Sequence, residues 1–171
     1  METLPHQAGD HTVSSQPATP IFIADVHLGK LAKALRLLGF DTLYSHAFTA
    51  AQLLTLARAQ HRVVLSRGSA FRKHPDVTAV IIESENLDEQ LLQVVQQFDL
   101  TKKMQPFSRC LVCNSLLVPV AKEHIAAHLQ QNTILYFNEF WQCTVCKRIY
   151  WKGSHYDRML QLVTKIEQLN T

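Results

Sequence analysis

Short apolar runs and longer amphipathic stretches alternate along the first hundred residues of the chain. The short runs are rich in β-branched residues and are bounded by polar or turn residues, which predicts strands. These expected strands cover residues 21–25, 41–46, 62–66 and 77–84. In the other stretches apolar residues recur every three or four positions, which predicts helices over 26–40, 50–60 and 86–98. Strands alternating with helices indicate an α/β fold with a mainly parallel sheet flanked by helices.

Residues at the expected helix ends agree with these limits. Gly39 is placed to end the first helix in the left-handed conformation. Thr49 can cap the second helix, and Asn86 with Glu89 has the spacing of a capping box at the start of the third.

The pattern changes after Leu100, where a linker leads to two C-x-x-C pairs separated by a 29-residue spacer. The spacer is long enough to form strands and a helix of its own. A further strand is expected at 149–153, followed by a closing helix that begins at Ser154. We therefore predict three parts, which are a disordered leader (1–19), an α/β domain (20–101) and a second module with its closing helix (107–170).

Every cysteine of the chain belongs to one of the two pairs, which are formed by Cys110, Cys113, Cys143 and Cys146. Two such pairs facing each other make a tetrahedral thiolate cage suited to zinc. Because four thiolates leave no open coordination position, the expected role of the zinc is structural. An iron site with four thiolates is chemically possible, and spacing alone leaves that alternative open. His124 and His128 could share a helical face, but we interpret them as solvated helix residues.

Composition and charge narrow the class of protein. The chain is 47% hydrophobic and 18% charged, which fits a globular protein, and its formal net charge is only +3. The charge is uneven, with eight basic and ten acidic residues in 1–100 but nine and four in 101–171. No apolar run approaches the roughly 18 residues that span a bilayer, and residues 1–20 lack the features of a secretory signal. We expect a cytoplasmic protein without a membrane partner, in which thiols stay reduced and disulfides are not expected.

A few carboxylates lie near the expected sheet edges. Asp25 follows the first strand, where it could cap the next helix or serve a ligand at the carboxyl edge of the sheet. Asp41 begins the second strand and so belongs to the opposite edge, whereas Glu83 and Glu85 flank the end of the fourth strand on the edge of Asp25. Two-metal phosphodiester hydrolysis needs several carboxylates close together, and this set is small.

Four stretches together resemble one known family closely. They are FIADVHLGKLAKALRLLGFDTLY, RVVLSRGSAF, RCLVCNSLL and FWQCTVCKRIYWKGSHYDRM. Over residues 20–165 the chain resembles the Mut-seven C-terminal RNase domain family, and C-x-x-C-x-x-x-Y-W-x-G-S-H is the most specific motif. The resemblance implies a PIN-like domain fused to a zinc ribbon and an RNase activity that depends on Mg²⁺ or Mn²⁺.

The resemblance carries over residue by residue, with two departures. Asp25 matches the aspartate that follows the first strand of the family, and Gly39-Phe40-Asp41 matches its Gly-Tyr/Phe-Asp motif. Members carry acidic residues before the second helix, where this chain reads AFTAAQ around Thr49. Members end the third strand in Leu-Thr-Arg-Asp, where this chain has Leu-Ser-Arg-Gly, ending in Gly68. A glycine side chain cannot bind a metal, so two acidic positions expected from the family are empty.

Three functions fit these observations. The first is a metal-dependent endoribonuclease that uses Asp25, Asp41 and Glu83. The second is a catalytically inactive module that binds RNA or a ribonucleoprotein, and the third is an adaptor for a protein partner. We predict an RNase-family protein with weak or absent nuclease activity. The residues expected to contact RNA are basic or aromatic, namely Lys30, Lys33, Arg36, Arg67, Arg72, Lys147, Arg148 and Trp151.

Overall fold

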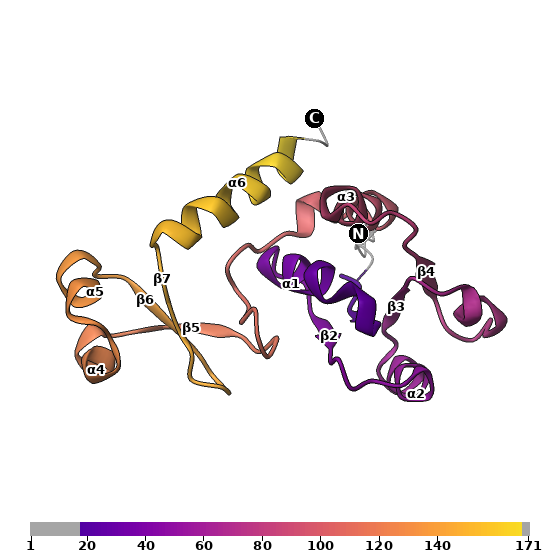
Figure 1. The fold of residues 1–171 in the computed structure, drawn as a ribbon, viewed down its shortest axis with the longest axis horizontal. Helices are drawn as coiled ribbons and strands as arrows, with labels where there is room; N and C mark the ends of the chain where they lie inside the picture. Colours follow the sequence, from indigo (N-terminus) through magenta and orange to yellow (C-terminus); the bar gives the residue numbers. More distant parts are fainter. Residues whose placement is uncertain (1–17, 169–171) are drawn as a thin grey trace, which may run out of the picture.

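The structure, a computed structural model, describes residues 18–168 (Figure 1). Residues 1–17, which hold most of the expected leader, lie outside the described part of the chain, as do residues 169–171. Among residues 18–168 no helix has the length and apolar character needed to cross a membrane.

A four-stranded parallel sheet forms the centre of the first half, in the order β2-β1-β3-β4. Its strands are β1 (Phe22–Ala24), β2 (Thr42–Tyr44), β3 (Val63–Ser66) and β4 (Ala79–Ile81). Each lies inside a strand expected from the sequence, and the two central strands are buried along their whole length. The predicted α/β fold with a parallel sheet is confirmed.

Helices cover both faces of this sheet. The 3-10 turn η1 (Val26–Leu28) leads into α1 (Gly29–Leu37), which packs on one face together with α3 (Leu87–Gln97). The other face is covered by α2 (Ala50–Gln60) and the 3-10 segment η2 (Ser69–Lys73). Because alternate residues of a strand point to opposite faces, Phe22 and Ala24 join the first core cluster and Ile23 joins the second.

The helix ends form largely as predicted. Thr49 and Gln52 bond to each other's backbone N–H in a capping box. Asn86 accepts from two backbone N–H groups at the start of α3, but the Glu89 carboxylate accepts from Ser84 instead of completing a box. Gly39 has φ of 96°, and a Cβ there would lie 2.3 Å from the carbonyl oxygen of Gln105, so only glycine fits.

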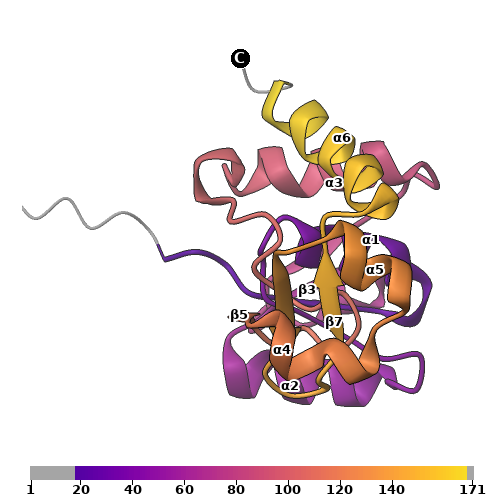
Figure 2. The same cartoon turned by 90° about the vertical axis from the view of Figure 1, so that its left-hand side faces the viewer.

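The second half contains a three-stranded antiparallel sheet, in the order β5-β6-β7. Its strands are β5 (Leu117–Val120), β6 (Phe140–Cys143) and β7 (Ile149–Trp151). The long spacer folds between β5 and β6 as α4 (Lys122–Ile125), the 3-10 turn η4 (Ala126–His128) and α5 (Gln131–Tyr136). We call residues 108–153 the ribbon module; it lies on the left of Figure 1 and faces the viewer in Figure 2.

The last helix, α6 (Ser154–Gln168), leaves the ribbon module and runs back toward α3 (Figures 1 and 2). Val163 and Ile166 are buried in the core cluster that α1 and α3 form on the parallel sheet, and Lys165 pairs with Asp88 of α3. The sequence groups this helix with the second module (107–170), but its apolar face packs on the first. The 3-10 turn η3 (Thr101–Lys103) lies in the connection between the two halves.

This packing predicts unequal effects of two alanine substitutions on α6. Ile166→Ala should lower the free energy of unfolding by about 2–4 kcal/mol, because Ile166 is 1% exposed within the core of the parallel sheet. Leu160→Ala, on the same helix but 41% exposed, should change it by no more than about 0.5 kcal/mol. Urea denaturation of both variants measures this, and equal losses would contradict the packing of α6.

Candidate functional site

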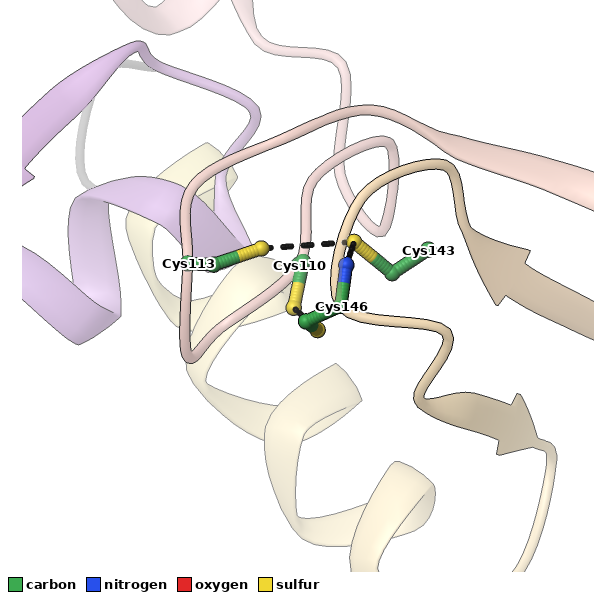
Figure 3. Close-up of side chains that lie close together, drawn as sticks. All are labelled: Cys110, Cys113, Cys143 and Cys146. Carbon is green, nitrogen blue, oxygen red and sulfur yellow. Dashed lines mark hydrogen bonds between the residues drawn. The ribbon is translucent and has the colours of Figure 1, made fainter.

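The four cysteines form one compact cluster at the base of the ribbon module (Figure 3). Cys110 and Cys113 lie in the loop before β5, Cys143 ends β6, and Cys146 lies in the turn before β7. Their four Sγ atoms lie within 4.8 Å of one another. The Sγ atoms of Cys113 and Cys143 are 3.3 Å apart and those of Cys110 and Cys146 are 3.6 Å apart. The predicted pairing of the two C-x-x-C motifs into one site is confirmed.

The two turns that carry these pairs have the same construction. In each pair the first cysteine donates its backbone N–H to the carbonyl five residues later, from Cys110 to Ser115 at 2.8 Å and from Cys143 to Arg148 at 2.9 Å. The residue after each second cysteine is left-handed, with φ of 71° at Asn114 and 61° at Lys147. The duplicated motif thus folds as two equivalent turns that present sulfur atoms to one point.

The donor set fits a zinc ion. A tetrahedral ion with bonds of about 2.3 Å separates its sulfur ligands by about 3.8 Å, close to the spacing of this cluster. Burial opposes ionisation of Cys113, but hydrogen bonds from the backbone and side chain of Ser115 outweigh it and lower the pKa of its thiol to about 6. Four thiolates this close repel one another, so full ionisation of the cluster requires a cation between them. The cluster is consistent with zinc binding, and because all four ligands come from the chain it suits a structural ion.

A buried arginine joins the cysteine turns to the parallel sheet. The Arg36 guanidinium donates to the carbonyl of Thr42 at 2.8 Å, and to those of Leu111 and Val112 at 3.1 and 3.0 Å. Arg36 is only 4% exposed, so this residue, expected together with Lys30 and Lys33 to contact RNA, does not lie on the surface with them. The ribbon module covers this part of α1, and the guanidinium bonds to backbone carbonyls of both halves. Arg36 therefore holds the two halves together and offers no surface to RNA.

Asp41 takes part in the same contact region between the two halves. We call this region the seam and define it by Arg36, Asp41, Thr42, Arg109 and Asn114. The Asp41 Oδ1 accepts from the Arg62 guanidinium at 2.6 Å and from the Asn114 side chain at 2.8 Å. The Asn114 Oδ1 in turn accepts from the backbone N–H of Thr42 at 2.9 Å, and Arg109 donates to the carbonyls of Gly39 and Asn114. Burial opposes ionisation of Asp41, but the hydrogen bonds from Arg62 and Asn114 outweigh it and lower the pKa of its carboxyl.

The three carboxylates proposed as catalytic do not meet. Asp41 lies at the amino end of β2, whereas Asp25 follows the carboxyl end of β1, so the two lie at opposite edges of a parallel sheet. Glu83 is exposed beyond the end of β4, on the edge of Asp25. Within residues 18–168, the four cysteines are the only group of three or more His, Cys, Asp or Glu side chains whose ligand atoms come this close.

The Asp25 carboxylate connects the end of β1 to the end of β3 through hydrogen bonds. Its Oδ2 accepts from Ser66 Oγ at 2.6 Å and from the backbone N–H of Arg67 at 2.8 Å, and its Oδ1 caps η1 by accepting from the backbone N–H of His27 at 2.9 Å. Ser66 Oγ also accepts from the backbone N–H of Gly68 at 3.0 Å. The capping role expected for Asp25 is confirmed, and the same carboxylate fixes the start of the loop that contains Gly68.

An open cleft of about 670 Å³ lies at this edge, between the start of α1 and the start of α3. Its charged lining consists of two cations, Arg67 and Lys30, and one carboxylate, Glu85. The Arg67 guanidinium donates to the carbonyl of Ser84 at 2.8 Å and reaches Glu85 at 3.4 Å. Gly68 is exposed with φ of −97°, and the nearest atom to an added Cβ is 3.8 Å away, so a side chain would fit there.

The remaining basic candidates separate into two regions. Lys30, Lys33 and Arg72 are exposed on the α/β side, while Lys147, Arg148 and Trp151 are exposed on the ribbon module. Their contact with RNA stays a prediction. His124 and His128 are exposed, in keeping with the solvated role expected for them.

One residue of this region, Asn114, went unrecognised in the sequence. Tyr150, the tyrosine of the family motif, places its hydroxyl 3.1 Å from the Cys110 Sγ. The position of Asn114, directly after a C-x-x-C pair, is the signal that could have found it, because asparagine tolerates the left-handed conformation that such a turn requires.

The seam predicts that Asn114→Gly destabilises the protein by about 1–3 kcal/mol, because the buried N–H of Thr42 loses its partner. Glycine keeps the left-handed turn, so the loss isolates the side chain. The matched control is Asn138→Ala, which removes an exposed amide bonded only to Lys122 and should cost less than about 0.5 kcal/mol. Thermal and urea unfolding of both variants measure the difference, and an unchanged Asn114→Gly would refute the seam.

The cysteine cluster predicts about one zinc per chain by elemental analysis of protein purified without added metal. Removal of the zinc by a strong chelator should lower the melting temperature, because the cysteine turns anchor one side of the seam. Cys110→Ser should lose both the zinc and the stability. Iron in place of zinc would support the alternative four-thiolate site, and a metal-free protein of unchanged stability would contradict both.

Comparison with known proteins identifies the family of the chain over both of its halves. No curated protein and no solved structure matches the chain significantly. Residues 20–163 match the family model described as the Mut7-C RNAse domain, which spans the parallel sheet, the ribbon module and most of α6. The family expected from the sequence motifs is confirmed, and the chain belongs to the Mut7-C RNase domain family.

Proposed function

We propose that this chain is an RNA-binding member of its family whose α/β half does not cleave RNA by the metal-dependent route. The observation that carries the proposal is the state of Asp25. Its carboxylate accepts three hydrogen bonds from the protein, and among residues 18–168 it belongs to no group of three or more His, Cys, Asp or Glu side chains that could hold a metal ion. A carboxylate has about four lone-pair positions, so most of the positions of Asp25 are already used by hydrogen bonds that connect the two strand ends and cap η1.

The surroundings of Asp25 also oppose a divalent ion. Two-metal hydrolysis depends on several carboxylates that hold two ions about 4 Å apart. Here the position after Arg67 is Gly68, and the AFTAAQ stretch before α2 has no acid. The Arg67 guanidinium, a fixed positive charge, instead lines this edge of the sheet.

RNA is the ligand that family membership favours, because the family is an RNase domain family. The residues from 101 onward carry nine basic and four acidic side chains, so they supply cations for phosphates. Zinc in the cysteine cluster would stabilise the ribbon module and take no part in a reaction.

A second candidate is the metal-dependent endoribonuclease. It is favoured by the position of Asp25 and Glu83 at the same edge of the sheet, beside the open cleft. In this version Asp25 and Glu83 would hold Mg²⁺ or Mn²⁺, and Asp41 would contribute only through the seam. Mg²⁺ and Mn²⁺ prefer carboxylate oxygens, which Glu83 can offer freely from its exposed position.

The test incubates purified protein with end-labelled single-stranded RNA in Mn²⁺ and, in parallel, in EDTA. Binding is measured by fluorescence anisotropy and cleavage by gel electrophoresis. We expect salt-dependent binding in both buffers and no cleavage above that of the EDTA reaction. Cleavage in Mn²⁺ that disappears in Asp25→Asn would establish the nuclease instead, and failure to bind RNA in either buffer would refute the proposal.

Gly68→Asp is the informative companion variant. The backbone conformation and the open space at Gly68 accommodate the new side chain, which adds a carboxylate to the loop that Asp25 fixes. We expect Mn²⁺ to raise the melting temperature of this variant and not that of the wild type. An equal rise in the melting temperatures of both proteins with Mn²⁺ would mean that the native edge already binds the ion.

A further inference from the structure

A second groove, of about 730 Å³, lies on the ribbon module. It runs between the segment after α4 and the β6–β7 turn, and it also reaches the first residues of α6. We call it the ribbon groove and define it by six of its lining residues, which are His128, Gln142, Lys147, Arg148, Trp151 and His155.

We infer that the ribbon groove binds an unpaired RNA nucleotide, with its base against Trp151 and the adjoining phosphates against Lys147 and Arg148. The inference rests on the proposed RNA-binding function and names the surface that performs it. It places RNA on the cysteine-bearing half of the molecule and away from the cleft beside Asp25.

The strand register sets this groove apart from the seam. Gln142 and Ile149 pair across β6 and β7, so their side chains share one face of the sheet, and that face lines the groove. Trp141 and Tyr150 pair on the other face, where they line an inner cavity together with Leu37 of α1. The face of the ribbon groove is therefore not the one that packs toward the α/β half, and Trp151, at the end of β7, borders both the groove and the inner cavity.

The basic side chains of the groove have no carboxylate partner among residues 18–168. Lys147 and Arg148 are exposed, and neither forms an ion pair in the part of the chain that the structure describes. Of the residues from 18 to 168, no acidic one lines the groove. By contrast, the nearby Lys152 pairs with Glu139 at 2.8 Å. A basic groove without acids attracts a polyanion, and its binding should weaken with added salt.

Trp151 supplies a fixed aromatic surface. Its ring centroid lies 6.4 Å from that of Phe140, which is buried, and 6.5 Å from that of Phe137. These contacts hold the indole in place while leaving Trp151 37% exposed. Bases stack on such aromatic side chains in single-stranded complexes. In an A-form duplex the bases are stacked on each other inside the helix, so the groove suits an unpaired nucleotide.

The cysteine cluster positions the cations. Lys147 occupies the left-handed position directly after Cys146, and its Nζ donates to the carbonyl of Thr144 at 2.9 Å, which leaves two further protons for a phosphate. The backbone carbonyl of Arg148 accepts from the N–H of Cys143. Both residues thus belong to the second cysteine turn, and the shape of the groove depends on that turn. The exposed imidazoles of His128 and His155 add ring nitrogens that can bond to base edges or phosphates.

The experiment measures binding of a short fluorescein-labelled uridine oligonucleotide by anisotropy. Arg148→Glu and Trp151→Leu should each weaken binding about tenfold, while Trp151→Phe, which keeps an aromatic ring, should weaken it no more than about threefold. The matched control Lys122→Glu reverses one charge in the same module outside the groove and should also stay within about threefold. The same oligonucleotide in a duplex should bind at least tenfold more weakly than the single strand.

Zinc content and melting temperature of each variant separate a contact from a folding defect. If a groove variant loses zinc, a second readout replaces it. Trp141→Phe leaves Trp151 as the sole tryptophan, and its fluorescence should be quenched by the uridine oligonucleotide. Wild-type protein that fails to bind RNA would refute the proposed function itself. Wild-type binding that neither Arg148→Glu nor Trp151→Leu weakens, or an unquenched Trp151, would overturn the groove and leave the proposed function standing.

Discussion

The guanidinium of Arg36 is the interaction on which the arrangement of the two halves depends. It comes from α1, whose neighbouring residues form the core of the parallel sheet, and it ends on two carbonyls of the first cysteine turn. Asn114 makes the return connection from that turn to Thr42 and Asp41. These groups are buried or half-buried, so each unmade bond would cost the desolvation of a polar or charged group. A metal that shapes the cysteine turn therefore also shapes the seam, and through it the base of the parallel sheet.

The sequence predicted what local patterns determine. Apolar periodicity located each strand of the parallel sheet, and cysteine spacing located the metal centre, because in both cases the determining residues are close in the chain. The prediction that Arg36 contacts RNA was wrong. Its spacing from Lys30 and Lys33 places it near them on α1, but such a face is open to water only if nothing covers the helix. The carbonyls that cover it lie 75 and 76 residues further on. The roles of Asn114 and α6 were missed for the same reason, since both act across long separations in the sequence.

The sheet edge beside Asp25 and the ribbon groove differ in how many of their polar and aromatic groups are free to contact a ligand. At the sheet edge, polar atoms of Asp25 and Arg67 form hydrogen bonds within the protein, and the glycine at position 68 contributes only backbone. In the ribbon groove, Lys147 and Arg148 have no acidic partner among residues 18–168, and Trp151 keeps an open surface. Under the proposed function, this member of an RNase domain family would retain contact with RNA while its carboxylates serve packing. Family membership by itself does not distinguish these uses, because function depends on the site and not on the fold.

The return of α6 to the parallel sheet has a consequence for the order in which the protein can form during synthesis. The ribbon module is an insertion within the layer that α1, α3 and α6 build on one face of the sheet. Residues 20–100 leave the ribosome before the ribbon module does, but the apolar patch that Val163 and Ile166 cover stays open to water until α6 emerges. Both cysteine pairs precede that helix in the chain, so they have emerged by then. Metal capture can therefore come before closure of the core, and a ribosome-bound chain stalled before α6 would expose apolar surface that chaperones recognise.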